Sequence, residues 1–74
     1  MNKNDYIKNR RYLSSKLIEA REKAGISQKQ VAESKIVSQS ELSKLENGDR
    51  RVDFIILLKL AKLYNQPITF FILE

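Results

Sequence analysis

The sequence contains no cysteine, no histidine and no tryptophan, and it has only one proline and two glycines among its 74 residues. Without cysteine and histidine the chain has no disulfide framework, no Cys/His zinc site, no thiol nucleophile and no histidine acid–base catalyst. Its longest apolar run, residues 54–58, is far too short to cross a membrane, and residues 1–16 lack the apolar segment of a secretory signal. We therefore expect a single small cytoplasmic domain without membrane contact.

Catalytic constellations are also missing from the sequence. The carboxylates are scattered along segments that we expect to be helical, and none of them forms a nucleophile–base pair or a metal-binding cluster with its neighbours. We therefore expect no catalytic residues, no metal site, no cofactor and no enzyme activity.

The net charge of +5 is distributed unevenly along the chain. Residues 1–23 carry seven basic and three acidic side chains, whereas residues 24–53 carry five of each. A basic surface favours a polyanion, and nucleic acid is the usual one. A solvated basic face that only aids solubility explains the same excess, so charge alone does not decide between the two interpretations.

The first helix is predicted from an apolar stripe. Leu13, Leu17, Ala20 and Ala24 follow the spacing i, i+4, i+7, i+11, which predicts a helix from about residue 10 or earlier to residue 24. Residues 1–12 are polar and basic, and they form either a frayed or disordered arm, able to lie along a phosphate backbone, or a helical extension that begins near residue 4 or 5. Arg21 lies close to the stripe and needs a partner if it is buried.

Two short helices with matching start signals follow. Ser27 with Gln30 and Ser38 with Glu41 both fit the S-x-x-(E/Q) capping box, in which two side chains satisfy each other's backbone donors. Gly48 suits the left-handed residue just past a helix C-terminus. Two capped helices with so short a connection predict a helix-turn-helix at about 27–47.

The C-terminal third is rich in apolar residues. Asp53 is a good N-cap for a fourth helix that is apolar almost all round, which predicts burial on more than one side. Pro67 suits the first position of a short fifth helix. The last apolar segment, I-T-F-F-I-L, has two interpretations. It covers the fourth helix with Ile68 and Phe71, or it forms a dimer interface, since the side chains of one short helix cannot all point inward. We favour the interface and assign to it Ile68, Phe70, Phe71 and Ile72.

The segment L-I-E-A-R-E-K-A-G-I-S-Q-K-Q-V-A-E-S-K-I-V-S-Q-S-E-L-S-K-L-E-N-G-D-R-R, residues 17–51, resembles the lambda-repressor-like, Cro/XRE-type helix-turn-helix domain family. Its most specific parts are S-Q-x-x-V-A and S-Q-S-x-L-S-K-L-E-N-G, and the likeness extends from residue 13 to about residue 72. The resemblance implies an all-α, compact bundle of five helices. We therefore divide the chain into a basic arm or helix extension at 1–12 and a DNA-binding domain at 13–72.

The resemblance also implies residue roles. A structural salt bridge between Arg21 and Glu46 would tie the recognition helix to the first helix. Base contacts would come from Gln39, Ser40 and Lys44, and Ser43 is a further candidate because it lies on the same face. Phosphate contacts would come from Gln28, Asn47, Arg50 and Arg51.

Three positions depart from the family pattern. Ile36 stands where the turn of the family usually has glycine, and a β-branched residue is strained at positive φ. Lys35 occupies a position that is often apolar, where its stem can pack while its charge stays hydrated. Val52 replaces a common proline. Because of these departures, we expect the turn between the two short helices to differ in shape from that of the family.

The combined interpretation is a sequence-specific, double-stranded-DNA-binding transcriptional regulator. We expect a repressor that acts as a homodimer and reads a palindromic operator through the major groove with the helix at 39–47. The alternative is a protein-interaction module or antitoxin component that binds a protein partner through its apolar C-terminus.

Overall fold

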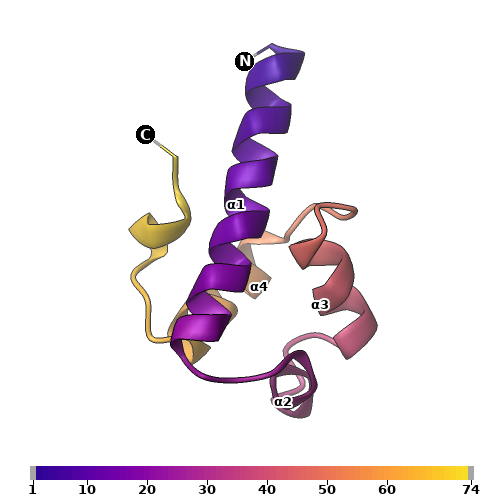
Figure 1. Ribbon diagram of the computed structural model, residues 1–74, viewed down its shortest axis with the longest axis vertical. Coiled ribbons are helices and arrows are strands. Elements are labelled where there is room, and N and C mark those ends of the chain that lie inside the picture. The colour runs from indigo at the N-terminus through magenta and orange to yellow at the C-terminus, as the bar shows by residue number, and fades with distance from the viewer. Residues whose placement is uncertain (1, 74) are drawn as a thin grey trace.

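The computed structural model describes residues 2–73 and consists of helices joined by short connections (Figure 1). Four α-helices are followed by one turn of 3₁₀ helix, and the described residues contain no strand. The all-α prediction is confirmed. The elements are α1 (Lys3–Lys23), α2 (Gln28–Glu33), α3 (Gln39–Glu46), α4 (Phe54–Leu63) and the 3₁₀ helix η1 (Ile68–Phe71).

The first helix begins far earlier than its apolar stripe. Asn2 caps α1, and its side-chain oxygen accepts a hydrogen bond from the Asp5 backbone N–H at 2.9 Å. The helix ends before Gly25, which has φ of +73°. Residues 3–12 are therefore helical, and Figure 1 shows them projecting beyond the other helices. Met1 lies outside the described residues, and the functional division at residue 12 stays a prediction.

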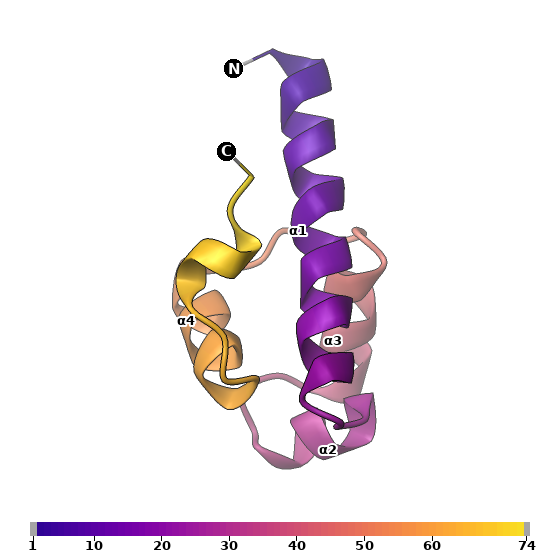
Figure 2. The same cartoon turned by 60° about the vertical axis from the view of Figure 1, so that its left-hand side comes forward.

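The core forms around the C-terminal half of α1. Leu17 and Ala20 are buried there, whereas Ala24, the last member of the expected stripe, is exposed. Figure 2 shows α2 and α3 on one side of α1 and α4 with η1 on the other. The remaining core side chains come from all of the other elements and their connections: Val31, Val37, Leu42, Leu45, Leu57, Leu60, Ala61, Tyr64 and Phe71.

The fourth helix is less buried than its sequence predicts. Leu57, Leu60 and Ala61 face the core, but Phe54, Ile55 and other apolar residues of α4 remain exposed. The prediction that α4 is covered on more than one side is wrong for the isolated chain. With so few elements, only one face of α4 has a partner, and 62% of Phe54 and 56% of Ile55 remain accessible.

The expected fifth helix is a single 3₁₀ turn. The residue before it, Pro67, is extended, with ψ of 153°, and the Phe70 N–H donates to the Pro67 carbonyl at 3.0 Å in the tighter i→i+3 pattern. Phe71 is only 3% exposed and contacts the Phe70 ring edge-to-face at 5.3 Å. The assignment of Phe71 to a dimer interface is therefore wrong, because this ring fills the core. Ile68 and Phe70 are partly buried against the core, and Ile72 is 51% exposed.

Candidate nucleic-acid interface

Both short helices begin with the expected capping boxes. The Ser38 Oγ accepts a hydrogen bond from the Glu41 N–H at 3.1 Å, and the Glu41 Oε1 accepts one from the Ser38 N–H at 3.2 Å. Ser27 and Gln30 make the same reciprocal pair at the start of α2, at 3.1 and 2.8 Å. Each box satisfies two backbone donors that would otherwise lack partners at the helix start, so the first turn of α3 is well defined.

One side of α3 faces solvent and carries the expected base-contacting residues. Gln39, Ser40 and Lys44 are exposed and Ser43 is partly buried, whereas Leu42 and Leu45 are buried on the opposite side. The helical spacing places these four polar side chains together on one face. This face offers amide, hydroxyl and ammonium groups, which are the groups that read base edges in a major groove.

The other side of α3 is held by a buried carboxylate. Arg21 reaches from α1 and donates from Nε to Glu46 Oε2 at 2.7 Å and from Nη2 to Glu46 Oε1 at 3.1 Å. The Glu46 side chain is 3% exposed and the Arg21 side chain 15% exposed. Hydrogen bonding to Glu46 raises the pKa of the Arg21 guanidinium, which therefore stays charged. The structure thus brings together the two residues expected to pair.

Gln28 contacts the same carboxylate from α2. Its Nε2 donates to Glu46 Oε1 at 2.9 Å, and its side chain is partly buried. The resemblance implied a phosphate contact for Gln28, and the structure adds a hydrogen bond through which Gln28 supports α3. Glu46 therefore links α1, α2 and α3, and this link fixes the orientation of the exposed face of α3.

The connection after α3 carries the other expected phosphate contacts. Asn47, Arg50 and Arg51 are all exposed, and Gly48 between them has φ of +77°. Arg50 Nη1 lies 3.6 Å from Glu41 Oε2, so part of its charge is compensated. Hydrogen bonds from Ser38, backbone first and side chain second, lower the pKa of Glu41, with Arg50 adding a smaller effect in the same direction.

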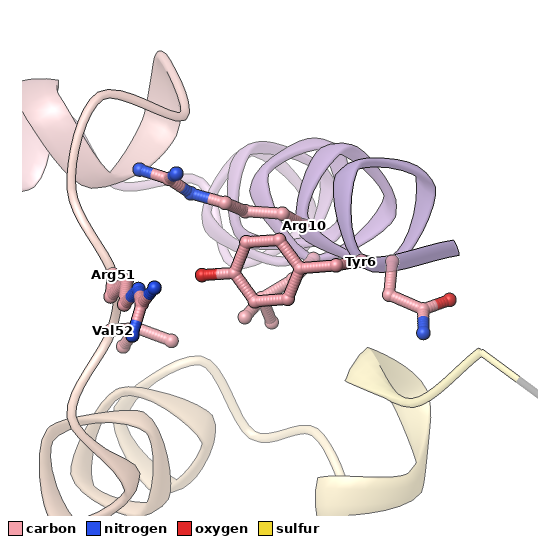
Figure 3. Close-up of a pocket in the computed structure, with 6 residues that line it drawn as sticks. Tyr6, Arg10, Arg51 and Val52 are labelled. Atoms are coloured by element: carbon pink, nitrogen blue, oxygen red, sulfur yellow. The ribbon is translucent and has the colours of Figure 1, made fainter. Parts of the chain in front are cut away.

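A pocket that the sequence interpretation missed lies beside this connection (Figure 3). It has a volume of about 340 Å³, and its lining comes from the N-terminal half of α1 and from two residues that precede α4. The lining residues are Tyr6, Asn9, Arg10, Leu13, Arg51 and Val52. The spacing of Tyr6, Arg10 and Ser14 at i, i+4 and i+8 was the available signal, but it identifies a helix face only once residues 3–12 are known to be helical.

The turn between α2 and α3 is reshaped one residue earlier than expected. The residue at positive φ is Lys35, with φ of 65°, rather than Ile36. Ile36 thus avoids the strain that a β-branched residue would have at positive φ, whereas the expectation of a packed Lys35 stem is wrong. Ile36 packs partly buried against the core while Lys35 is exposed. An unbranched lysine tolerates the left-handed region better than a β-branched residue, and the shift lets Ile36 contribute apolar contacts.

Comparison with known proteins agrees with this geometry. A helix-turn-helix family model (HTH_3) matches residues 17–71, which contain both capping boxes, the Arg21–Glu46 pair and the exposed face of α3. The chain belongs to the Cro/XRE-type helix-turn-helix family. The HTH-type transcriptional regulator ImmR of Bacillus subtilis (strain 168) is 45% identical over 53 residues, which are 72% of this chain and 42% of that protein. The chain thus spans less than half the length of this relative. No solved structure matches this chain.

Membership in the Cro/XRE-type family supports a DNA-binding transcriptional regulator. The family match begins at residue 17, so the first 14 described residues of α1, Lys3 to Lys16, precede it. Within residues 2–73 the structure contains no group of three or more acidic side chains placed to bind a metal ion. The same part of the chain contains no helix with the length and apolarity needed to cross a bilayer.

Proposed function

We propose that this chain is a sequence-specific transcriptional repressor that inserts α3 into the major groove of its operator. The observation that carries the proposal is the arrangement of α3: one face is fixed by Glu46 to Arg21 and Gln28, and the other presents Gln39, Ser40 and Lys44 to solvent. A helix held so rigidly with polar side chains outward suits direct readout, because base recognition requires side chains at set positions in the groove.

The contacts divide into two classes. Gln39 and Lys44, with Ser40 and Ser43, read base edges: glutamine pairs with adenine N6 and N7, and lysine donates to guanine O6 and N7. Asn47, Arg50 and Arg51 contact backbone phosphates at the end of α3, and Gln28 does so at the start of α2. These phosphate contacts position the protein, whereas the base contacts specify the sequence.

A homodimer is the second part of the proposal. The exposed residues Phe54, Ile55 and Leu58 lie on one face of α4, and Ile72 adds a further exposed apolar side chain near the C-terminus. Side chains of this size lower the free energy when a second copy covers them. A two-fold dimer would present two α3 helices to a palindromic operator, and occupancy of that operator would block transcription. We place this activity in the cytoplasm.

Selection from a random pool of DNA duplexes tests the proposal. Wild type should enrich a site with two-fold symmetry. The variant Gln39→Ala with Lys44→Ala should lose the sequence preference and keep weak, salt-sensitive binding through its phosphate contacts. If wild type enriches nothing, the DNA-reading function is wrong. The fold would then serve a protein partner at the exposed apolar residues, as an antitoxin component does.

A further inference from the structure

The pocket beside α1 is lined by positively charged side chains. Its six lining residues include two arginines and no carboxylate. The Nε of Arg10 is buried and has no hydrogen-bond partner among residues 2–73. Arg21 and Arg50, in contrast, both have carboxylate partners. Arg10 and Arg51 both line the pocket and no lining carboxylate compensates their charges, so an anionic ligand with acceptor oxygens fits it.

The second arginine is placed at the pocket by an aromatic contact. The Cζ of Arg51 lies 5.2 Å from the centre of the Tyr6 ring, which is within the range of a cation–π interaction. Figure 3 shows Tyr6 pointing from α1 toward the connecting segment that carries Arg51 and Val52. A cation–π contact does not use the guanidinium N–H groups as hydrogen-bond donors, so those of Arg51 stay available to an acceptor.

The location of the pocket identifies the source of the anion. The chain after α3 crosses α1 closely at Ser14, since a Cβ on Gly48 would lie 3.4 Å from the Ser14 Oγ. Arg10 and Tyr6 follow one and two turns farther toward the N-terminus on the same face of α1. The pocket therefore continues the surface of the 47–51 connection, to which we assign phosphate contacts.

We propose that this pocket binds a phosphate group of the DNA backbone, held jointly by Arg10 and Arg51. The inference rests on the proposed function and extends it: the projecting half of α1 enlarges the DNA footprint beyond α3 and its connection. Guanidinium groups match phosphate oxygens with paired N–H donors, and a duplex supplies phosphates at close, regular intervals. Tyr6 acts as a positioning residue for Arg51. Four of the six lining residues, Tyr6, Asn9, Arg10 and Leu13, precede the family match at 17–71, so most of this site lies outside the matched segment.

The test is the salt dependence of DNA affinity for Arg10→Gln, Arg51→Gln and the double variant. Each variant should weaken binding to the selected operator and to an unrelated duplex by the same factor, because a phosphate contact carries no sequence information. Because the two arginines share one phosphate, the double variant should lower the slope of log K against log salt by about 0.9 in total, not by about 1.8. Lys8→Gln is the matched control, since it removes one charge from an exposed position on the same part of α1.

Each outcome decides a different point. Three results would overturn the inference. They are a slope of log K against log salt that Lys8→Gln lowers as much as Arg10→Gln does, a decrease of about 1.8 in this slope for the double variant, or slopes that match wild type in all variants.

A titration with inorganic phosphate, followed by NMR at the arginine side-chain Nε–H groups, distinguishes binding of a free anion from binding of DNA. Arg10-dependent phosphate binding together with unchanged DNA slopes would assign the pocket to a small anion instead. Loss of sequence selection by wild type would contradict the proposed function, whereas retained selection with unchanged slopes would contradict only the pocket. Arg51 is exposed, so Arg51→Gln keeps the test valid even if Arg10→Gln destabilises the fold.

Discussion

Glu46 accepts hydrogen bonds from three donors with its two carboxylate oxygens: Arg21 Nε, Arg21 Nη2 and Gln28 Nε2. This one side chain sits at the meeting point of α1, α2 and α3, and it is 3% exposed. A buried ion pair of this kind adds little net stability by itself, but removing one partner leaves an uncompensated charge. Its function at the residue scale is therefore to specify where α3 lies.

Glu46→Ala should destabilise the fold by about 3–5 kcal/mol, because Arg21 would stay buried without its carboxylate. Urea unfolding measures this change. Arg21→Met combined with Glu46→Leu serves as the control, since replacing both charges with apolar side chains should recover most of the loss. A Glu46→Ala variant within about 0.5 kcal/mol of wild type would show that the pair does not fix α3, because that range is typical of ordinary surface substitutions.

Tyr64 is buried, with 1% of its surface exposed, and its hydroxyl has no partner within the described chain. Burial raises the pKa of Tyr64 to about 12. Because the pKa of the folded state lies above the unfolded value near 10, the stability from this group is intact below about pH 10 and is lost as the pH rises toward 12.

Wild type should therefore lose up to about 2–3 kcal/mol more stability than Tyr64→Phe between pH 10 and pH 12. At pH 7, Tyr64→Phe should be neutral or slightly stabilising, since it removes an unsatisfied polar group without opening a cavity. Thermal unfolding of both proteins across this pH range provides the measurement. Parallel pH profiles would mean that the Tyr64 hydroxyl already has an acceptor or contacts water.

At the scale of elements, the short helices depend on their caps for stability, whereas α1 is longer than the core requires. The eight residues of α3 would be marginal in isolation, and the Ser38–Glu41 box with the buried Leu42 and Leu45 gives this helix its definition. The 21 residues of α1 exceed what the core requires, and its first half leaves the bundle to line the basic pocket.

Ser38→Ala should cost about 1 kcal/mol of stability and should weaken operator binding, because the first turn of α3 carries Gln39 and Ser40. Ser40→Ala is the matched control: it removes the same hydroxyl two residues later, outside the cap, and should leave stability within about 0.5 kcal/mol. Chemical denaturation of both variants tests the cap. Equal losses in the two variants would refute the specific role of the Ser38 hydroxyl.

Local signals in the sequence were sufficient for the helix-turn-helix. The signals that were interpreted correctly all act within a few residues: the two capping boxes, Asp53 as an N-cap and Gly48 at the end of a helix. Features set by tertiary packing were not predictable. Which side chains pack into the core decides three such features. These are the exposed face of α4, the burial of Phe71 and the positive φ at Lys35 in place of Ile36. The pocket required knowing that residues 3–12 continue α1.

At the scale of the whole molecule, the bundle has a polar and an apolar outer surface. The exposed face of α3, the 47–51 connection and the extension of α1 carry the polar groups assigned to DNA. The exposed face of α4 carries Phe54, Ile55 and Leu58, which the isolated chain leaves in water. In the proposed dimer, this separation of surfaces would let one protomer bind DNA and a second copy at the same time.

Ile55→Glu should shift the protein from dimer to monomer and weaken binding to a palindromic operator more than to a half-site. A glutamate in the first turn of α4 is compatible with the helix dipole, so folding should persist. Sedimentation velocity measures the assembly, with Lys59→Gln as the control on the same helix, because it lowers the net charge by the same one unit. Wild type that stays monomeric at concentrations where it binds DNA, or an unchanged dimer of Ile55→Glu, would rule out this interface.

The central claim is that α3 reads bases, and the specificity ratio tests it most directly. This ratio compares Kd for an unrelated duplex with Kd for the selected operator, in wild type and in Gln39→Ala. Loss of a bidentate base contact should lower the free energy of discrimination, which is RT times the logarithm of this ratio, by about 1–3 kcal/mol, while Kd for the unrelated duplex and its salt slope stay unchanged. A wild-type ratio near one, or a ratio that Gln39→Ala leaves intact, would contradict base reading by this helix.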